Sequence, residues 1–179
     1  CRTAEAKEAI TSQEWARRKE LLYQLLDRHR DRSGSRYDCV IPVSGGKDSY
    51  FQTHVIKNEM GFNPLLVTYN GNNYMPEGWR NVHRMKEVFG VDHVFYSPSV
   101  TLLKKLNRLG FIVMGDMNWH AHVGITTLPV RVAAQFQVPV LIWGEYGYLD
   151  LAGQFSMNDF PEMSYRDRVE HFARGYEWN

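Results

Sequence analysis

Residues 39–49 read Cys-Val-Ile-Pro-Val-Ser-Gly-Gly-Lys-Asp-Ser, and this stretch decides the fold. Its apolar first half, residues 39–43, is typical of a buried β-strand. Its polar second half, Ser44–Ser49, is a glycine turn that a helical pattern follows. Gly45 and Gly46 allow unusual φ/ψ values and the close approach of another group to the backbone. The sequence therefore predicts a strand, a tight turn and a helix that begins at the turn.

The turn gathers groups that suit a polyphosphate. Backbone N–H groups, a helix N-terminus, the hydroxyls of Ser44 and Ser49 and the ammonium group of Lys47 converge at its tip. Asp48 differs from them, because a carboxylate repels phosphates unless a divalent cation lies between. The loop therefore predicts ATP with Mg²⁺, and Asp48 is the candidate ligand that meets the metal through the bound nucleotide.

The loop is not the common Walker loop, since Ile41 and Asp48 stand where that pattern needs a glycine and a hydroxyl residue. Ser-Gly-Gly-Lys-Asp-Ser, residues 44–49, instead resembles the PP-loop of the ATP pyrophosphatases. The resemblance implies an enzyme that splits ATP between its α and β phosphates and passes AMP to a substrate oxygen. A solvated surface turn is the alternative, but the strand before the loop and the helix after it favour the PP-loop.

Composition sets the class of protein. The chain has 179 residues, enough for one domain with a sizeable core, of which 44% are apolar and 23% charged. A net charge of +1 gives no electrostatic reason to expect nucleic acid as a partner. No apolar run approaches the roughly 20 residues of a membrane span, so we expect a cytoplasmic protein without a membrane partner. Cys1 and Cys39 give no disulfide framework.

Strands and helices alternate along the sequence. The strands are expected at 38–43, 65–69, 93–96 and 139–143, and the helices at 11–30, 47–60, 76–89, 98–109 and about 164–174, with 111–137 helical in two pieces broken near Gly124 and restarted at Pro129. This alternation predicts an α/β fold, a parallel twisted sheet with helices on both faces. We assign residues 1–36 to an N-terminal helical segment and 37–179 to the PP-loop domain.

Two helices have specific expectations. Thr11 and Glu14 form a capping box, and apolar residues then recur at helical spacing and should face the core. These residues are Trp15, Leu21, Leu22, Leu25 and Leu26. Ser97 is expected to cap the helix that Pro98 opens and Gly110 closes.

Ligands of parallel α/β sheets bind beyond the carboxyl ends of the strands. The resemblance implies that backbone atoms near Val67 and Tyr69 hold the adenosine. Asn72 and Asn73 follow the same strand with amides able to bond ribose or sugar hydroxyls, although Asn-Gly-Asn-Asn is also an ordinary turn sequence.

Gly144 and Glu145 follow the fourth expected strand. Gly144 would allow a close approach near the α phosphate, and Glu145 would bind Mg²⁺ or orient a nucleophile. A helix cap is the alternative for Glu145, but a carboxylate on the ligand edge is expensive to desolvate without a purpose. The predicted catalytic residues are therefore Lys47, Asp48 and Glu145.

The stretch 114–122 carries the remaining candidates. Asp116 and His120 are four residues apart and share a helix face, whereas His120 and His122 do not. Substrate contact or helix capping therefore outranks a zinc site here. Arg131 is the candidate cation for a substrate carboxylate or phosphate, although a surface arginine is the commoner case.

Three later motifs, at 143–151, 154–160 and 171–178, resemble the N-acetyl sugar amidotransferases of bacterial surface-polysaccharide and lipopolysaccharide (O-antigen) biosynthesis. The resemblance extends from about Tyr37 onward. Members of that family begin with a cysteine-rich segment resembling a zinc site, of which Cys1 would be the last cysteine. Both ends of the chain are therefore expected to be cut, with structural Zn²⁺ expected in the full-length protein alone.

The resemblance also implies a reaction. The carbonyl oxygen of an acetamido group on a nucleotide-linked sugar attacks the α phosphate, pyrophosphate leaves, and ammonia then displaces AMP to give an acetamidino sugar. Because the chain has no glutaminase pattern, a separate glutaminase subunit would supply the ammonia. Two alternatives remain open, a sulfur-inserting enzyme like the tRNA thiolases and a non-catalytic ATP-binding module. The thiolase alternative needs a thiol near the loop, but Cys39 lies roughly 13 Å away at the other end of its strand.

Overall fold

The computed structural model describes residues 10–71, 74–144 and 173. The predictions for Cys1, Asn72, Asn73 and Glu145, and for the helix at about 164–174, lie outside the described residues. The proposed division of the chain at residues 36 and 37 stays a prediction.

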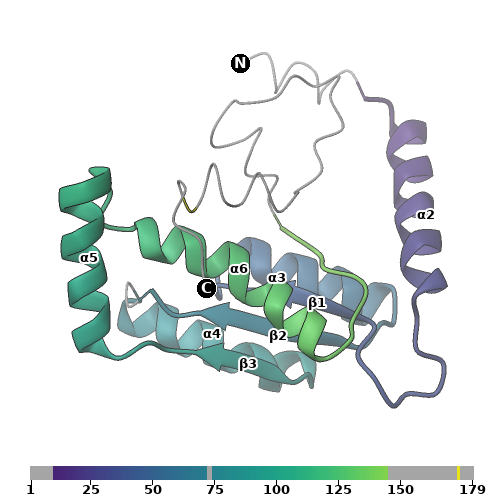
Figure 1. Cartoon of the computed structure of the whole chain (residues 1–179). Coiled ribbons are helices and arrows are strands. Elements are labelled where there is room, and N and C mark those ends of the chain that lie inside the picture. Colours follow the sequence, from purple (N-terminus) through teal and green to yellow (C-terminus); the bar gives the residue numbers. More distant parts are fainter. Residues whose placement is uncertain (1–9, 72–73, 145–172, 174–179) are drawn as a thin grey trace.

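Three parallel strands form the sheet, in the order β1-β2-β3 (Figure 1). They are β1 (Cys39–Pro42), β2 (Pro64–Tyr69) and β3 (His93–Tyr96), each within a residue or two of its predicted bounds. Val40 lies opposite Leu65, and Val67 lies opposite Val94. The predicted fourth strand at 139–143 is reduced to one parallel bridge between Val40 and Leu141.

Helices cover both faces of the sheet, as predicted (Figure 1). The helical elements are α2 (Ser12–Arg28), α3 (Lys47–His54) with its π-helical continuation η1 (Val55–Glu59), α4 (Pro76–Phe89), α5 (Val100–Met114) and α6 (Trp119–Gln135). Alternate side chains of β1 point to opposite faces. Ile41 packs in the cluster that includes Met85 of α4, and Val40 packs in the cluster that includes Val132 of α6.

Helix α4 follows its sequence signals closely. Pro76 opens it, Val82, Met85 and Phe89 are buried, and Gly90 ends it in the left-handed conformation with φ 60°. The result places the backbone of Val82 directly beneath the glycine turn.

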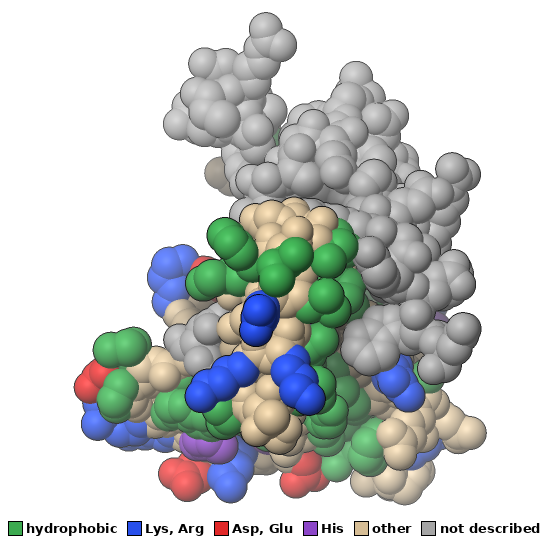
Figure 2. Space-filling model, turned by 60° about the vertical axis from the view of Figure 1, so that its left-hand side comes forward, with side chains coloured by type: hydrophobic (Ala, Val, Ile, Leu, Met, Phe, Trp, Pro, Cys, Tyr) green, Lys and Arg blue, Asp and Glu red, His purple; other side chains and the backbone are tan. Residues whose placement is uncertain are grey.

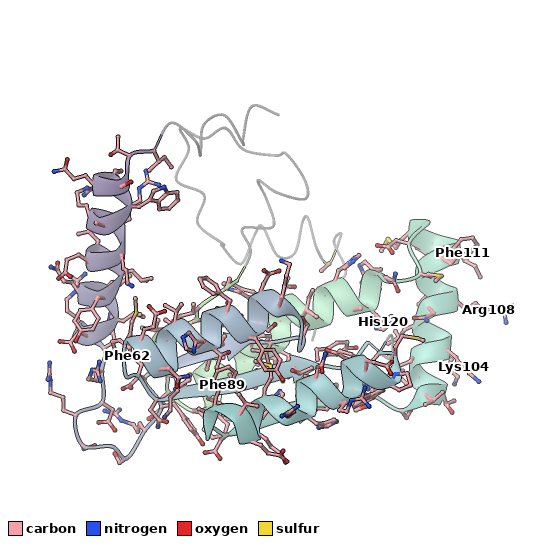
Figure 3. The ribbon with its side chains drawn as sticks, turned by 180° about the vertical axis from the view of Figure 1, so that it is seen from behind. Phe62, Phe89, Lys104, Arg108, Phe111 and His120 are labelled. Carbon is pink, nitrogen blue, oxygen red and sulfur yellow. The ribbon has the colours of Figure 1, made fainter. Side chains whose placement is uncertain are left out.

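The prediction for α2 is confirmed at its start and wrong along its length. Thr11 Oγ1 accepts a hydrogen bond from the Glu14 backbone N–H at 3.2 Å. Leu26 is buried, but Trp15, Leu21, Leu22 and Leu25 are each 40% exposed or more. The reason is that α2 packs on the domain near its C-terminal end, where Tyr23 lies edge-on against Phe62, whereas farther along the helix Lys19 reaches the domain through an exposed ion pair with Glu59 at 3.1 Å (Figures 1 and 3).

Two further boundaries differ from the sequence prediction. Ser99, and not Ser97, caps α5 by accepting a hydrogen bond from the Leu102 N–H at 3.3 Å, and α5 ends at Gly115 instead of Gly110. Gly124 and Pro129 lie inside one continuous helix, α6, instead of breaking it. Packing of α6 on the sheet overrides the local preference of both residues.

Helix α5 stands at the edge of the domain. Its Lys104, Arg108 and Phe111 point away from the rest of the molecule, whereas His120 of α6 lies on the inner side (Figure 3). Lys and Arg side chains gather on this face, surrounded by hydrophobic ones (Figure 2). In the described part of the chain, no helix combines the length and the hydropathy needed to cross a membrane.

Candidate nucleotide site

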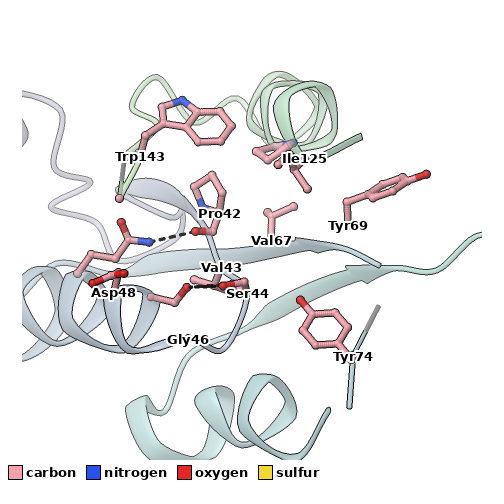
Figure 4. Close-up of a pocket in the computed structure, with 14 residues that line it drawn as sticks. Pro42, Val43, Ser44, Gly46, Asp48, Val67, Tyr69, Tyr74, Ile125 and Trp143 are labelled. Carbon is pink, nitrogen blue, oxygen red and sulfur yellow. Dashed lines mark hydrogen bonds between the residues drawn. The ribbon is translucent and has the colours of Figure 1, made fainter. Parts of the chain in front are cut away.

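A cavity of about 220 Å³ opens beyond the carboxyl ends of β1 and β2 (Figure 4). It is lined by the glycine turn, the end of β2, helix α6 and the segment after the Leu141 bridge. The lining residues include Ser44, Gly46, Asp48, Ser49, Gln52, Val67, Tyr69, Tyr74, Ile125, Pro129, Trp143 and Gly144. Seven of these residues were predicted from the sequence to lie at one edge of the sheet, although their segments are up to 100 residues apart; they are Ser44, Gly46, Asp48, Ser49, Val67, Tyr69 and Gly144.

The glycine turn is held tightly against α4. Gly45 has φ +78°, and a Cβ atom built on it would stand 2.6 Å from the Val82 backbone nitrogen and 2.8 Å from its Cα. Gly46 is the N-cap of α3 in an extended conformation, and no described side chain caps that helix. The first N–H groups of α3 therefore face the cavity edge with the positive end of the helix dipole, which is the usual environment for a phosphate.

The two serines of the turn close it on itself. The Ser44 backbone N–H donates to Ser49 Oγ at 2.9 Å, and the two hydroxyl oxygens are 3.3 Å apart. Ser49 is buried, whereas Ser44 is exposed at the cavity. These hydrogen bonds hold the turn in its shape, which lowers the entropic cost of binding a ligand.

Lys47 and Asp48 form an ion pair at the mouth of the cavity. Lys47 Nζ lies 2.7 Å and 2.9 Å from the two carboxylate oxygens of Asp48, with side chains 88% and 58% exposed. Asp48 lines the cavity, and Lys47 is outside its lining. An exposed pair of this kind contributes little to stability, so Lys47 is free to turn toward an incoming phosphate.

Buried hydrogen bonds hold the strand that leads into the turn. Thr68 Oγ1 donates to the Val43 carbonyl oxygen at 2.6 Å and lies 2.8 Å from His93 Nε2. Because the single hydroxyl proton goes to Val43, the His93 Nε2–H must donate to Thr68. Burial lowers the pKa of His93 to about 4, and His83 and Lys86 add to the effect.

We expect this histidine to make stability depend on pH. In the unfolded chain His93 takes up a proton near its ordinary pKa of about 6.5, whereas the folded chain resists protonation down to about 4. The free energy of unfolding should therefore fall as the pH decreases through this window. Urea denaturation of wild type and His93→Gln, which keeps the N–H donor, measures the effect. Parallel pH profiles of the two proteins would contradict it.

The far wall of the cavity depends on the absence of a side chain at Gly124. A Cβ atom there would stand 2.6 Å from three ring carbons of Tyr69. The Tyr69 hydroxyl lies 3.3 Å from His120 Nδ1, and its ring stacks on Tyr96 with centroids 5.8 Å apart. His120 is buried, and its Nε2 is 2.5 Å from the side-chain amide of Asn107 on α5. Tyr69 is therefore fixed from three sides.

Gly124→Ala should displace the Tyr69 ring and cost about 1–3 kcal/mol of stability, the usual range for overpacking. The double variant with Tyr69→Leu is the control, because removing the ring removes the clash. We expect the two substitutions to be strongly non-additive in thermal unfolding. If the losses of stability from the two substitutions were additive, a clash with the Tyr69 ring would not be the cause of the destabilisation by Gly124→Ala.

The remaining predicted residues do not meet at the cavity. Asp116 lies before α6, so the helix face predicted for Asp116 and His120 is wrong. Asp116 Oδ2 is 3.4 Å from His122 Nδ1, and its charge also acts on His120, where it opposes the lowering of the His120 pKa by burial. The helix starts only at Trp119, which removes the assumed helical spacing. Arg131 is exposed on α6, outside the cavity lining.

Metal ligands are sparse. Among residues 10–71 and 74–144, no group of three or more His, Cys, Asp or Glu side chains gathers to hold an ion. Asp48 alone at the cavity fits Mg²⁺, which often binds through one carboxylate and the phosphates of a substrate. The described residues offer no donor set for the expected Zn²⁺, since Cys1 is outside them.

The fold has relatives among solved structures. The ammonia-dependent NAD synthetase of Campylobacter jejuni, solved with a nitrate ion, has a TM-score of 0.57 at 13% identity, over 79% of this chain and 61% of that one. NMN synthetase of Francisella tularensis has a TM-score of 0.56 at 14% identity, over 82% and 60%. The chain has the fold of the NAD synthetases. It spans about three fifths of the length of either enzyme. No family model and no curated protein matches the sequence.

Within this NAD synthetase fold, sequence reasoning missed several residues of the cavity, and four of them lie outside the strands and the glycine turn. They are Gln52, Ile125, Pro129 and Trp143. Trp143 stands directly before Gly144, so its position gave a usable signal. The other three are helical, and their orientation toward the sheet edge follows from helix packing that no local pattern encodes.

Proposed function

We propose that this chain is the ATP-using part of an amidotransferase that converts an acetamido group of a nucleotide-linked sugar into an acetamidino group. The observation that carries the proposal is the Ser44–Ser49 turn at the cavity, where Gly45 is locked against Val82 and α3 presents its N-terminus. The NAD synthetase fold supports it, because one relative is named as an ammonia-dependent enzyme. The sequence resemblance to the N-acetyl sugar amidotransferases supplies the acceptor.

In this proposal the cavity holds only part of the nucleotide. Its volume of about 220 Å³ is below the roughly 300–1,000 Å³ of typical ligand pockets. The β and γ phosphates lie against the turn, and the adenosine extends past Val67 and Tyr69. Mg²⁺ bound with the phosphates would add positive charge beside Asp48 and the departing pyrophosphate.

The chemistry is two displacements. The carbonyl oxygen of the acetamido group bonds to the α phosphorus, and the bond to the bridging oxygen of pyrophosphate breaks. Lys47 and the N–H groups of the turn stabilise the negative charge that develops on pyrophosphate. Ammonia then bonds to the activated carbon, loses protons to a base and expels AMP. A separate glutaminase subunit in the cytoplasm supplies the ammonia, and Glu145 is the candidate base.

The sulfur-inserting alternative has little support. Cys39, the free cysteine in the described part of the chain, is 1% exposed at the start of β1, and burial raises the pKa of its thiol to about 12. Such a thiol is inert at neutral pH.

The test supplies the protein with ATP, Mg²⁺, isotopically labelled ammonium and a panel of nucleotide-linked diacetamido sugars. We expect mass spectrometry to detect a sugar in which one acetamido oxygen is replaced by the labelled nitrogen. Pyrophosphate release only with tRNA would favour the thiolase alternative. ATP binding without turnover on any acceptor would favour a binding module.

A further inference from the structure

Helix α5 is attached to the domain along a narrow line of contacts. Leu103 is 2% exposed, and the side-chain amide of Asn107 lies 2.5 Å from Nε2 of the buried His120. A Cβ atom on Gly110 would stand 2.6 Å from the Asp116 carbonyl oxygen, so the helix lies close against the segment before α6. These contacts fix the position of α5 and leave most of its circumference exposed (Figure 3).

The exposed part of α5 carries many large apolar side chains. Six of them are each at least 44% exposed, namely Val100, Leu102, Leu109, Phe111, Ile112 and Val113. Single exposed apolar residues are common on soluble proteins, but a contiguous patch usually marks a contact with another molecule. Hydrophobic side chains also surround the basic ones in the view of this face (Figure 2). The outer side of α5 therefore has the composition of an interface.

The same side of the helix carries a net positive charge. Lys104, Lys105 and Arg108, which we call the basic stripe, are all exposed. The sequence has no Asp or Glu between Asp92 and Asp116, and none of the three cations has an ion pair with another described residue. Because this charge is uncompensated within the described part of the chain, charge complementarity requires a partner that brings acidic groups.

The order of the side chains around α5 restricts the kind of partner. At about 100° per residue, Lys105 and Arg108 lie opposite the buried Leu103 and Gly110, and Ile112 lies between the two cations. The other exposed apolar residues lie on both flanks of the basic stripe. The matching surface therefore has its acidic groups near the centre and apolar side chains around them.

Three other partners fit this order poorly. A helix that lies on a membrane buries apolar residues at the centre of the contact and keeps Lys and Arg at the margins. A second copy of the chain, related by a twofold axis through α5, would place basic stripe against basic stripe. Nucleic acid would meet the cations and leave the apolar flanks uncovered. A protein surface satisfies both the charge and the flanks.

We propose that α5 is the docking surface for the glutaminase subunit, and that this subunit places carboxylates against the basic stripe and apolar side chains against its flanks. The inference rests on the proposed function, which requires such a subunit, and adds the surface that holds it. The location suits the role. Asn107 on the inner side of α5 contacts His120, and His120 Nδ1 lies 3.3 Å from the hydroxyl of Tyr69, which lines the cavity.

The test measures binding of the glutaminase subunit, which is purified as the glutamine-hydrolysing protein bound to the full-length wild-type chain in its own cells. The α5 double variant is Lys104→Glu with Arg108→Glu. The control is Arg80→Glu with Arg84→Glu, which makes the same change of charge at the same spacing on the exposed side of α4. In titration calorimetry we expect the Kd to rise by about tenfold or more in the α5 double variant and to stay within about twofold in the control. Phe111→Ala should raise the Kd by about threefold.

Four results would overturn the docking surface. Equal affinity of the two double variants is one, and the absence of any glutamine-hydrolysing protein bound to wild type is another. The third is binding of tRNA or of phosphatidylglycerol vesicles that only the α5 double variant loses while its affinity for the glutaminase is unchanged. The fourth is a wild-type dimer that only the α5 double variant dissociates in analytical ultracentrifugation.

Failure of this inference is distinct from failure of the proposed function, because pyrophosphate release can be driven by ammonium without the glutaminase. We expect ammonium-driven release to be the same in wild type and both double variants. Weakened glutaminase binding in the α5 double variant, with no pyrophosphate released by any protein, supports the docking surface and contradicts the proposed reaction. Ammonium-driven release with equal glutaminase affinity in both double variants overturns the docking surface and leaves the reaction standing.

Discussion

Gly45→Ala should weaken ATP binding by about tenfold or more. The new Cβ atom would stand 2.6 Å from the Val82 backbone nitrogen, and the φ of +78° is strained for any residue with a side chain. Neither the backbone of α4 nor the turn has a flexible group that could give way. The strain alone costs about 1–3 kcal/mol, and the turn must leave its place under the phosphates to relieve the clash. We expect the Kd for ATP to rise by about tenfold or more in titration calorimetry.

The control variant Gly61→Ala separates the effect of backbone strain at positive φ from the effect of the steric clash with Val82. Gly61 has φ +71°, nearly that of Gly45, but an added Cβ atom meets nothing within 4 Å. This variant should lose stability and keep its ATP affinity. Equal loss of ATP affinity in both variants would show that general destabilisation, and not the position of the turn, explains the effect.

Asp48→Asn should remove turnover and leave much of the ATP affinity. The carboxylate lines the cavity and is held 2.7 Å from Lys47, so the substitution removes the candidate Mg²⁺ ligand and frees the lysine. Loss of one electrostatic group at a reacting phosphate costs on the order of 10²-fold in kcat. Pyrophosphate release under saturating ATP measures it.

The side chain of Asp48 is exposed, so its replacement should not unfold the protein. Glu87→Gln, an exposed carboxylate on α4 away from the cavity, is the control for the loss of one negative charge. Turnover that is unchanged in Asp48→Asn would remove Asp48 from the catalytic site. Turnover that falls equally in both variants would point to a general charge effect.

Local sequence signals were enough where the structure depends on local interactions. The strand and turn at residues 39–49 and the helix from Pro76 to Gly90 carry their own start, stop and burial signals, and all of them were predicted. The rule that ligands bind beyond the carboxyl ends of parallel strands also placed Val67, Tyr69 and Gly144 beside the turn, because these ends meet at one edge of the sheet.

The sequence could not predict features that depend on how distant elements pack. The apolar residues of α2 have helical spacing, but that spacing does not say whether a partner surface covers them, and most are exposed. Gly124 and Pro129 are typical of helix breaks, yet Gly124 is there to accommodate the Tyr69 ring. Gln52 gave no signal, since its half-paired amide is visible only once Pro42 and Gly144 are in place.

The position at which ATP is cut tests the central claim most directly. Phosphorus NMR of the protein with ATP, Mg²⁺, ammonium and an acetamido sugar nucleotide distinguishes the products. The turn at Ser44–Ser49 and the reaction proposed for it predict AMP and pyrophosphate in equal amounts. ADP and inorganic phosphate would contradict the account, because they would mean cleavage between the β and γ phosphates.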